Sequence, residues 1–375
     1  MTVRVCLVTS EYPPVIGGIA SHVFELARAM TAASVEATVV HPISLISSLS
    51  ARSEAPGVTV LRPKMVKAQP FYDFTLRLWM RRHLTKEKFD LVHVHGVRPL
   101  AATRDLSLPV VFTNHTSGFL GRLNAEPRRK RRTAALLEHV DALLAPSDEL
   151  VAAAQAFGYA GPAQMIPNGV DAERFAPGPS EARAAWGIGA DETVIVLARR
   201  LVKKNGVVGF AKAVAQMRER NFRVVVAGDG PDREEMVEIL AKAGMRDRVT
   251  FLGAVPNSSM PEIYRACDIG VLPSLAEATS ISGLEAMACG LPLVGTNVGG
   301  IPAIVADGVS GVLVPPADPK ALAEALGRMV DDAGLRRAMG KAGRRSAQDN
   351  FSWPIIARRT AAAYEACLSQ RSGRR

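Results

Sequence analysis

Short β-branched runs alternate with longer helical periods along almost the whole chain of 375 residues, and this alternation constrains the fold more than any other feature. The first example is VRVCLVTS followed by ASHVFELARAM, and the succession continues as far as the run GVLVPP at 311–316. Each such pair is typical of a βαβ unit, in which a helix returns the chain to a parallel strand. The sequence therefore predicts an α/β fold of doubly wound parallel sheets.

Length and one change in composition predict two domains. A chain of this length exceeds what one compact core usually holds. The stretch 171–192 is rich in Pro, Gly and Ala and poor in β-branched residues, which indicates a hinge. We expect one domain over 1–172 and a second over 190–351, with a helix over 352–370 that returns to the first domain.

The apolar runs predict the strands of both domains. In the first domain they lie near 3–9, 36–41, 57–61, 91–95, 109–113, 141–145 and 163–166. In the second domain six runs repeat the design, namely VIVLA, RVVVAG, VTFLG, DIGVLP, PLVGT and GVLVPP.

Composition excludes several classes of protein. A hydrophobic content of 48% with 22% charged residues argues against extended disorder, and no apolar run reaches the roughly 18 residues that span a bilayer. Met1 leads directly into a strand pattern without the features of a signal peptide, so we expect a cytoplasmic location. The four cysteines form no C-x-x-C pair and are expected to be reduced core residues.

A net charge of +10 predicts an anionic partner. The densest basic run, Arg128-Arg129-Lys130-Arg131-Arg132, opens a helical stretch and is either a solvated helix face or a contact with an anionic membrane surface. With 5% aromatic residues and no zinc-finger or RNP-like motif, the chain lacks the stacking groups of nucleic-acid binders. We expect peripheral contact with the inner face of the plasma membrane as one possibility and no nucleic-acid partner.

Two carboxylates, Glu277 and Glu285, lie eight positions apart where the strand pattern CDIGVLPS passes into a helix. Parallel sheets bind ligands at the carboxyl ends of their strands, so this position favours a binding site. Alternatively, Ser282 and Glu285 match the S-x-x-E pattern of a capping box, which would stabilise the helix and nothing more.

Two further loops follow strands at the same end of their sheets. Gly17-Gly18 opens the first helix, where backbone N–H groups can approach a phosphate, although a structural βα turn would look the same. The loop ARRLVKKNG at 198–206 offers Arg200 and Lys204 to a departing diphosphate without a metal ion, and the alternative is a solvated basic loop.

The histidines favour a core role over a metal site. His93 and His95 share one face of a strand and lack a third ligand at suitable spacing, whereas His115 follows a strand at the crevice end. The sequence contains no Asp-x-Asp at a strand end, no G-x-S-x-G and no H-E-x-x-H. We therefore expect no metal and no hydrolase site.

Taken together, these residues resemble the retaining glycosyltransferases of family 4 over essentially the whole chain. The matches are the stretch from Glu277 to Glu285 with AMACGLPLVGTNVGG (an E-x7-E motif), Gly17-Gly18, IPNGVD at 166–171, Arg200 with its lysine, GDGP at 228–231 and Trp353. The resemblance implies a GT-B architecture, in which two facing Rossmann-like domains leave an interdomain cleft.

The resemblance also implies transfer of a sugar, with retention and without a metal or cofactor, from a nucleotide-diphosphate sugar to an acceptor hydroxyl. A UDP-sugar is expected ahead of a GDP-sugar, and the acceptor is a lipid-linked or glycan molecule of cell-envelope polysaccharide, lipid-linked oligosaccharide or glycolipid synthesis. The implied catalytic residues are Glu277, His115, Arg200 and Lys204. The implied donor-binding residues are Gly17, Gly18, Arg200, Lys204, Gly230, Val255, Glu277, Thr279, Ser280, Ile281, Ser282 and Glu285.

By the family pattern, Glu277 would contact sugar hydroxyls, Glu285 the ribose, and Arg200 with Lys204 the diphosphate. Gly18 would offer N–H groups to the phosphates, His115 would approach the donor sugar, and the base would rest near 253–255.

This chain departs from the family pattern at two places. Ala278-Thr279-Ser280 replaces the common Gly-Phe-Gly, and Ser282 stands where proline is frequent. The family lysine usually comes five residues after the arginine, but that position is Asn205 here, and Lys204 comes one residue early. We expect Lys204 to take the role, with Lys203 as the alternative.

Two other functions fit the same pattern. The altered loop at 278–280 is compatible with a non-catalytic GT-B subunit that binds a nucleotide sugar within a transferase complex. A sugar-nucleotide epimerase or a phosphorylase would share the architecture, but the sequence shows no cofactor-lysine motif for phosphorolysis.

Overall fold

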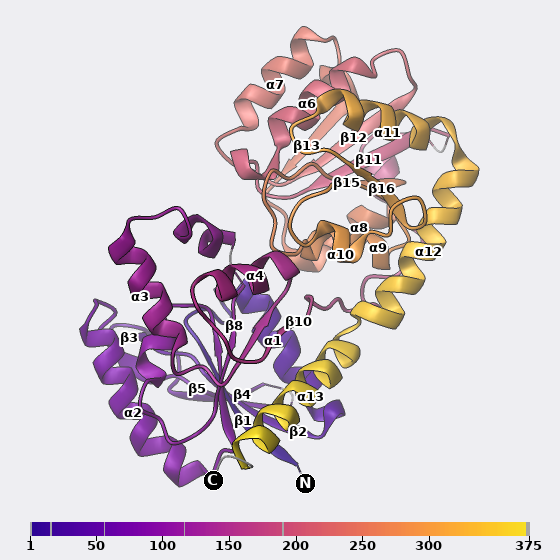
Figure 1. Ribbon diagram of the computed structural model, residues 1–375. Helices are drawn as coiled ribbons and strands as arrows, with labels where there is room; N and C mark the ends of the chain where they lie inside the picture. The colour runs from indigo at the N-terminus through magenta and orange to yellow at the C-terminus, as the bar shows by residue number, and fades with distance from the viewer. Residues whose placement is uncertain (1, 16, 56, 116, 190, 373–375) are drawn as a thin grey trace. The chain divides into compact units, whose positions relative to one another are not determined.

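The computed structural model describes residues 2–15, 17–55, 57–115, 117–189 and 191–372, which form two compact units (Figure 1). Unit 1 comprises Met1–Gly169 and Trp353–Arg375, and unit 2 comprises Val170–Ser352. The stretch interpreted as a hinge belongs to unit 2, where Phe175 and Ile188 are buried in the core.

Unit 1 is built around a largely parallel sheet. Its strands are β1 (Val3–Thr9), β2 (Val35–Val40), β4 (Arg52–Ala55), β5 (Val58–Leu61), β7 (Leu91–His95), β8 (Val110–Thr113), β9 (Ala142–Ala145) and β10 (Ala163–Met165), and a separate pair is β3 (Ile43–Ser44) with β6 (Lys64–Met65). Its helices are α1 (Gly18–Met30), α2 (Phe71–Glu87), α3 (Pro127–Leu137), α4 (Asp148–Ala156) and α13 (Trp353–Ser372), with short 3₁₀ turns η1 (Thr31–Ala33), η2 (Leu100–Thr103) and η3 (Ser117–Arg122).

The strand order of this sheet is β10-β9-β8-β7-β1-β2-β5-β4, and the order reverses between β1 and β7. All neighbours are parallel except β4, which pairs antiparallel with β5 at the edge. The sequence did not predict β4 because its residues, RSEA, lack the apolar run that marks a strand. The carboxyl ends of β1, β7 and β8 therefore meet at one edge of the sheet.

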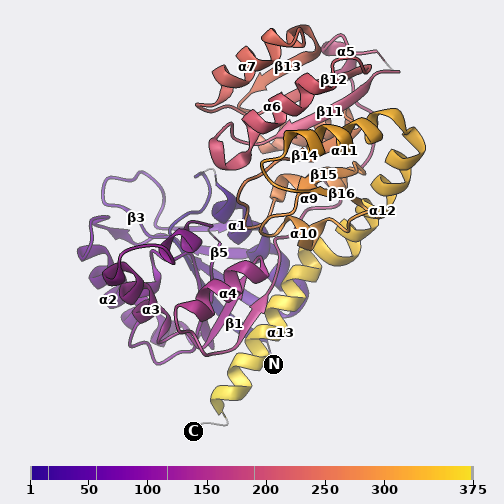
Figure 2. The same cartoon turned by 45° about the horizontal axis from the view of Figure 1, so that its top comes forward.

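Two helices that are far apart in the sequence, α1 and α13, pack side by side in unit 1 (Figures 1 and 2). Val23 and Leu26 of α1 and Ile356 and Tyr364 of α13 are almost completely buried in one core cluster. The core also contains the inward side chains of β1, β2 and β5. The final helix thus completes the hydrophobic core of unit 1.

Unit 2 contains a second, fully parallel sheet. Its strands are β11 (Thr193–Ala198), β12 (Phe222–Ala227), β13 (Val249–Gly253), β14 (Ile269–Leu272), β15 (Leu293–Thr296) and β16 (Gly311–Val314). Its helices are α5 (Ala182–Ala185), α6 (Val207–Gln216), α7 (Arg233–Lys242), α8 (Met260–Arg265), α9 (Ile281–Ala288), α10 (Ile301–Ile304), α11 (Pro319–Asp331) and α12 (Ala333–Phe351), with 3₁₀ turns η4 (Lys203–Asn205), η5 (Arg246–Arg248) and η6 (Asn257–Ser259).

The order of this sheet is β13-β12-β11-β14-β15-β16, so the chain reverses its winding between β11 and β14. Alternate side chains of each strand enter two different core clusters because strand residues point to opposite faces. Ile195 and Leu197 pack on the side of α6, α7 and α11, whereas Val194 and Val196 pack with α8, α9 and α12. Both faces of the sheet are therefore covered.

None of the helices in the described part of the chain is both long enough and apolar enough to cross a bilayer.

Candidate functional site

The candidate site of unit 2 lies where the neighbouring strands β11 and β14 end. The order of the sheet reverses between these two strands, and doubly wound sheets form their ligand crevices at such a point. Two loops leave it, 199–206 after β11 and 273–280 after β14. Their main chains are joined, since the N–H of Leu275 donates to the carbonyl of Lys204 over 2.8 Å.

An ion pair between Arg199 and Glu277 connects the two loops through their side chains. The side chains are only 8% and 15% exposed, so the pair is largely removed from water. Nη2 of Arg199 also donates to Oδ1 of Asn205 over 3.3 Å. Nε and Nη1 of Arg199 are buried and have no hydrogen-bond partner among the described residues.

Arg200 and Lys204, the cations that the sequence analysis selected, both have exposed side chains. The inward cation is their neighbour Arg199, which the sequence analysis did not select. The replacement of the expected lysine by Asn205 was the sequence signal that a different cation, Arg199, could point inward. Asn205 is a buried amide at the position where a family lysine was expected, and its Nδ2 donates to the carbonyl of Arg200 over 2.7 Å.

The main chain at Glu277 packs directly against two glycines, Gly299 and Gly300. The N–H of Gly300 donates to the carbonyl of Glu277 over 3.2 Å. Gly299 has a φ of +54°, and a Cβ there would come within 1.6 Å of the same carbonyl oxygen. Only glycine allows this close approach, and it fixes where the Glu277 side chain leaves the loop.

Helix α9 begins after Ser280, whose hydroxyl accepts a hydrogen bond from the N–H of Gly283 over 3.1 Å. Ser282 therefore lies inside the helix and its hydroxyl bonds to that of Ser280 at 3.1 Å. The capping-box interpretation of Ser282 and Glu285 is wrong, because the cap is two residues earlier than the S-x-x-E pattern suggested.

Glu285 lies in the second turn of α9 and is buried. Its carboxylate accepts hydrogen bonds from Asn257 Nδ2 at 2.7 Å and from the hydroxyl of Tyr264 at 3.3 Å. Burial raises the pKa of Glu285 to about 7, although Asn257, Arg174 and Tyr264 act in the opposite direction. No sequence motif marked Asn257, which connects the loop after β13 to this carboxylate.

Four other residues selected from the sequence occupy loops or helix starts of unit 2. Thr279 is buried and donates to the carbonyl of Ala278 over 2.8 Å, and Ile281 is the first residue of α9. Val255 packs against the core after β13. Gly230, after β12, has its N–H bonded to the carboxylate of Asp229 at 2.8 Å.

In unit 1, Gly17 is the N-cap of α1 and Gly18 is its first residue. Among the described residues, no side chain caps this helix and its first turn contains no acidic residue, although Glu11 Oε2 lies 3.0 Å from the position of a Cβ on Gly17. The N–H groups at the start of a helix carry partial positive charge and have no partner within the helix. Phosphate binding by these N–H groups stays a prediction of the sequence.

Three histidines meet at the same edge of unit 1. His22 comes from α1, His95 from the end of β7, and His115 follows β8. His95 Nδ1 and His115 Nε2 are 2.9 Å apart, and His22 Nδ1 lies 2.7 Å from Oδ1 of Asn168. Burial lowers the pKa of His22 to about 4 and the pKa values of His95 and His115 well below 6.5. The cluster is therefore neutral at pH 7.

The histidine cluster supplies the third ligand that the sequence spacing did not show. His95 was set aside as a metal ligand because no third ligand was near in sequence, but the fold brings His22 and His115 to it, with one nitrogen of each within 4.8 Å of the others. The ring of His93 lies against that of His95, with centroids 4.0 Å apart, but its two nitrogens are 2.6 Å from Tyr364 Oη and Thr113 Oγ1.

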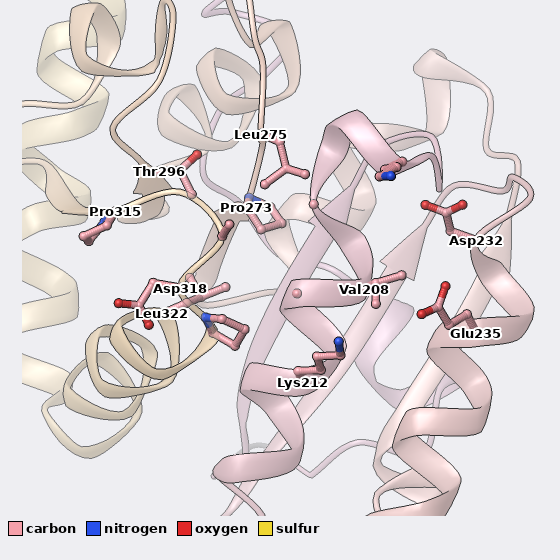
Figure 3. Close-up of a pocket in the computed structure, with 15 residues that line it drawn as sticks. Val208, Lys212, Asp232, Glu235, Pro273, Leu275, Thr296, Pro315, Asp318 and Leu322 are labelled. Atoms are coloured by element: carbon pink, nitrogen blue, oxygen red, sulfur yellow. The ribbon is translucent and has the colours of Figure 1, made fainter.

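A cavity of about 450 Å³ in unit 2 lies between α6, α7 and α11 (Figure 3). Asp232 and Glu235 line one side, and Pro273, Leu275 and Thr296 line the other. It does not include Arg199, Glu277 or Glu285. The cavity therefore adjoins the loops of the candidate site on the α6 side of the sheet, whereas Glu285 lies on the α9 side.

Comparisons with known proteins agree for both units of the chain. The family described as "Glycosyltransferase Family 4" matches residues 16–174, and the family described as "Glycosyl transferases group 1" matches residues 180–346. A D-inositol 3-phosphate glycosyltransferase of Kribbella flavida is 31% identical over 387 residues, which cover 93% of this chain and 90% of that protein.

Solved structures show the same fold. The sucrose-phosphate synthase of Thermosynechococcus elongatus matches with a TM-score of 0.83 at 24% identity, over 98% of this chain and all of that one. The Anabaena protein Alr3699/HepE, solved in complex with UDP, matches with a TM-score of 0.76 at 20% identity, over 97% of this chain and 100% of that chain.

Proposed function

Because the chain belongs to the family 4 glycosyltransferases and has their GT-B fold, we propose that it transfers a sugar from a nucleotide-diphosphate sugar to an acceptor hydroxyl. The observation that carries this proposal is the Arg199–Glu277 pair at the reversal point of the unit 2 sheet, with the buried carboxylate of Glu285 on the following helix. This arrangement offers cations to a diphosphate and carboxylates to hydroxyl groups.

The proposed reaction retains the anomeric configuration and uses no metal ion. The acceptor hydroxyl attacks on the face from which the diphosphate departs, and a phosphate oxygen takes the proton, so no side-chain nucleophile is needed. Arg199, Arg200 and Lys204 leave the same strand end and can neutralise the departing diphosphate. Glu277 accepts hydrogen bonds from the hydroxyls of the transferred sugar.

The proposed donor is a UDP-sugar, and unit 2 supplies most of its contacts. Glu285 accepts hydrogen bonds from the ribose hydroxyls, and the backbone at 253–255 receives the base. The hydroxyls of Thr279, Ser280 and Ser282 line the sugar. A structural relative is solved in complex with UDP, which agrees with a nucleotide-sugar donor. In unit 1, the Gly17-Gly18 turn contributes N–H groups to phosphate, and His115 contributes to the donor sugar.

A screen of donors and acceptors tests this proposal. Purified protein is heated with each of a panel of UDP- and GDP-sugars, and a true donor raises the melting temperature by mass action. The donor is then incubated with D-inositol 3-phosphate, glycans and lipid extracts, with and without EDTA. Product formation in EDTA, with retained configuration by NMR, is the expected result. Donor binding without any product would instead identify a non-catalytic nucleotide-sugar-binding subunit.

We propose that the acceptor is a lipid-linked or glycan molecule of the cell envelope and that unit 1 meets an anionic membrane surface at the cytoplasmic side. The basic run Arg128–Arg132 lies on α3 with all five side chains exposed. Each basic group near an anionic surface contributes about 1 kcal/mol of attraction.

Helix α2, which lies beside α3 in unit 1 (Figures 1 and 2), carries exposed apolar side chains. Phe71, Phe74 and Leu78 recur at helical spacing on α2 with 63%, 67% and 49% exposure, and we call them the α2 stripe. Leu45 and Ile46 follow β3, and β3 pairs in parallel with β6, which packs on α2.

Helices α2 and α3 are both hydrogen-bonded to the segment at η2. Arg77 of α2 donates to the carbonyl of Ala101 over 2.9 Å, and Arg104, just after η2, donates to the carbonyl of Ala135 on α3 over 2.7 Å. Exposed apolar groups beside exposed cations are the combination that binds an anionic lipid surface.

Vesicle sedimentation tests the membrane contact. We expect binding that rises with the phosphatidylglycerol content and falls when the α2 stripe is changed to serine or when Arg128–Arg132 are changed to glutamine. Val309→Ser, which removes an exposed apolar side chain of unit 2, serves as the matched control. Binding that ignores lipid charge and both sets of changes would remove this part of the proposal.

A further inference from the structure

Arg199 is a buried cation with unused hydrogen-bonding capacity. Its side chain is 8% exposed, and Glu277 and Asn205 are both bound through Nη2. Nε and Nη1 have no acceptor among the described residues. A guanidinium carries five N–H donors, and buried donors normally have partners, so three N–H groups here are available to a ligand with several acceptor oxygens.

The backbone holds Arg199 at the place where such a ligand would lie. Its N–H donates to the carbonyl of Ala227 at the end of β12 over 3.0 Å. The residue directly follows β11, next to the point where the order of the sheet reverses. The direction of its side chain is therefore fixed by strand pairing rather than by a free loop.

Asn205 makes the inward position of Arg199 possible. It is 5% exposed, its Nδ2 is occupied by the carbonyl of Arg200, and its Oδ1 accepts from Arg199. A lysine at 205 would replace this acceptor with a second buried positive charge beside Arg199. Like charges in a site of low dielectric repel strongly, so the site accommodates an inward arginine at 199 or a lysine at 205, but not both.

On the basis of the proposed transfer reaction, we propose that Arg199 is the principal cation for the diphosphate of the donor and replaces the lysine expected at Asn205. The unpaired N–H groups of Arg199 bind diphosphate oxygens, while Nη2 remains on Glu277 and keeps that carboxylate directed at the sugar. One guanidinium thereby sets the position of both the leaving group and the carboxylate. Arg200 and Lys204, whose side chains are exposed, add electrostatic attraction for the diphosphate.

Moving the charge between the two positions tests this inference. The binding of UDP and GDP is measured by calorimetry, with uridine and guanosine as probes that lack the diphosphate. We expect Arg199→Gly to weaken diphosphate binding by about ten- to a hundredfold, as for loss of a charged hydrogen bond, and to leave nucleoside binding unchanged. The double variant Arg199→Gly, Asn205→Lys places a lysine at position 205 in place of the lost arginine, and we expect it to recover most of the affinity for the diphosphate.

Two further variants keep the test decisive if the double variant folds poorly. Asn205→Lys alone places two cations together and is expected to lower the melting temperature, whereas Arg199→Lys keeps one charge and retains more affinity than Arg199→Gly. Arg200→Gln is expected to cost less affinity than Arg199→Gly. Arg218→Gln, on an exposed arginine after α6, is the control for loss of one positive charge.

The outcomes separate this inference from the proposed function. If the wild-type protein binds a nucleoside diphosphate and transfers sugar while Arg199→Gly does the same equally well, or a well-folded double variant shows no recovery, the assignment of Arg199 is wrong and the function stands. If the wild-type protein binds no nucleoside diphosphate and transfers no sugar, the proposed function is wrong and the assignment of Arg199 is wrong with it.

Discussion

Asn257, on the loop after β13, donates its side-chain amide to the buried carboxylate of Glu285 on α9 over 2.7 Å. The same Asn257 accepts a hydrogen bond at its Oδ1 from Nη2 of Arg174 at 2.5 Å. The loop expected to receive the base and the carboxylate expected to receive the ribose are thus held together before any ligand binds. Pre-organised polar groups of this kind lose little entropy on binding.

The burial of Glu285 predicts a pH-dependent effect of Glu285→Gln on stability. The folded pKa of about 7 lies above the ordinary value of 4.5, so the folded state binds more protons between these values. The stabilisation is full below pH 4.5 and is lost as the pH rises through 7. We therefore expect the difference between the melting temperatures of Glu285→Gln and wild type to shift in favour of the variant from pH 5 to pH 8.

Calorimetric melting of both proteins at the two pH values measures this difference. Glu238→Gln, on an exposed carboxylate of α7, is the control. A difference that does not change with pH would show that Glu285 is ionised in the folded state throughout.

Glu277→Gln is expected to remove transfer while the protein stays folded. The amide cannot pair with Arg199 as a carboxylate does, and it no longer accepts sugar hydroxyls at both oxygens. Loss of such a charged contact in the transition state costs about 2 to 4 kcal/mol. Steady-state kinetics with the identified donor, together with circular dichroism, measures the effect, and turnover equal to wild type would exclude a catalytic role for Glu277.

Gly299→Ala tests whether the glycine under Glu277 positions that side chain. A residue other than glycine at positive φ costs about 1 to 3 kcal/mol, and here the added Cβ would also displace the Glu277 carbonyl. Gly308→Ala is a matched control, because Gly308 has a φ of +73° with no heavy atom within 4 Å of its Cβ position.

The free energy of unfolding and kcat are measured for both glycine variants. Both variants should lose stability, but only Gly299→Ala should lower kcat. Equal effects of the two substitutions would show that the contact with Glu277 contributes nothing specific.

The histidines of unit 1 predict acid sensitivity. Burial lowers the pKa of His22 to about 4 and of His93 to about 3 from 6.5, so the unfolded chain binds protons first as the pH falls. Stability is full above pH 6.5 and decreases toward pH 4. His93→Gln removes one titrating group and should give a shallower decrease in melting temperature than wild type.

His83→Gln, on α2 outside this group, is the comparison for the histidine measurement. An identical acid profile for wild type and His93→Gln would contradict the depressed pKa of His93.

Much of the fold followed from the apolar pattern, because a strand buried on both faces must be apolar at successive positions. The run VIVLA predicted β11, and the run at 91–95 predicted β7 with the bounds that the structure gives. The pattern failed for β4, whose four residues form an edge strand by antiparallel pairing with β5. The start of α9 was also misplaced by two residues, since several serines near it could cap the helix.

The sequence by itself determined the parallel sheets, the two loops that follow β11 and β14, and the presence of two carboxylates and several cations in them. Only the tertiary structure decided that Arg199, and not Arg200, turns toward Glu277, and that His22, His95 and His115 come together. Two neighbouring arginines have the same chemistry, so the sequence does not show which of them points inward. Strand register and packing against distant segments decide between them, and a local sequence pattern does not contain that information.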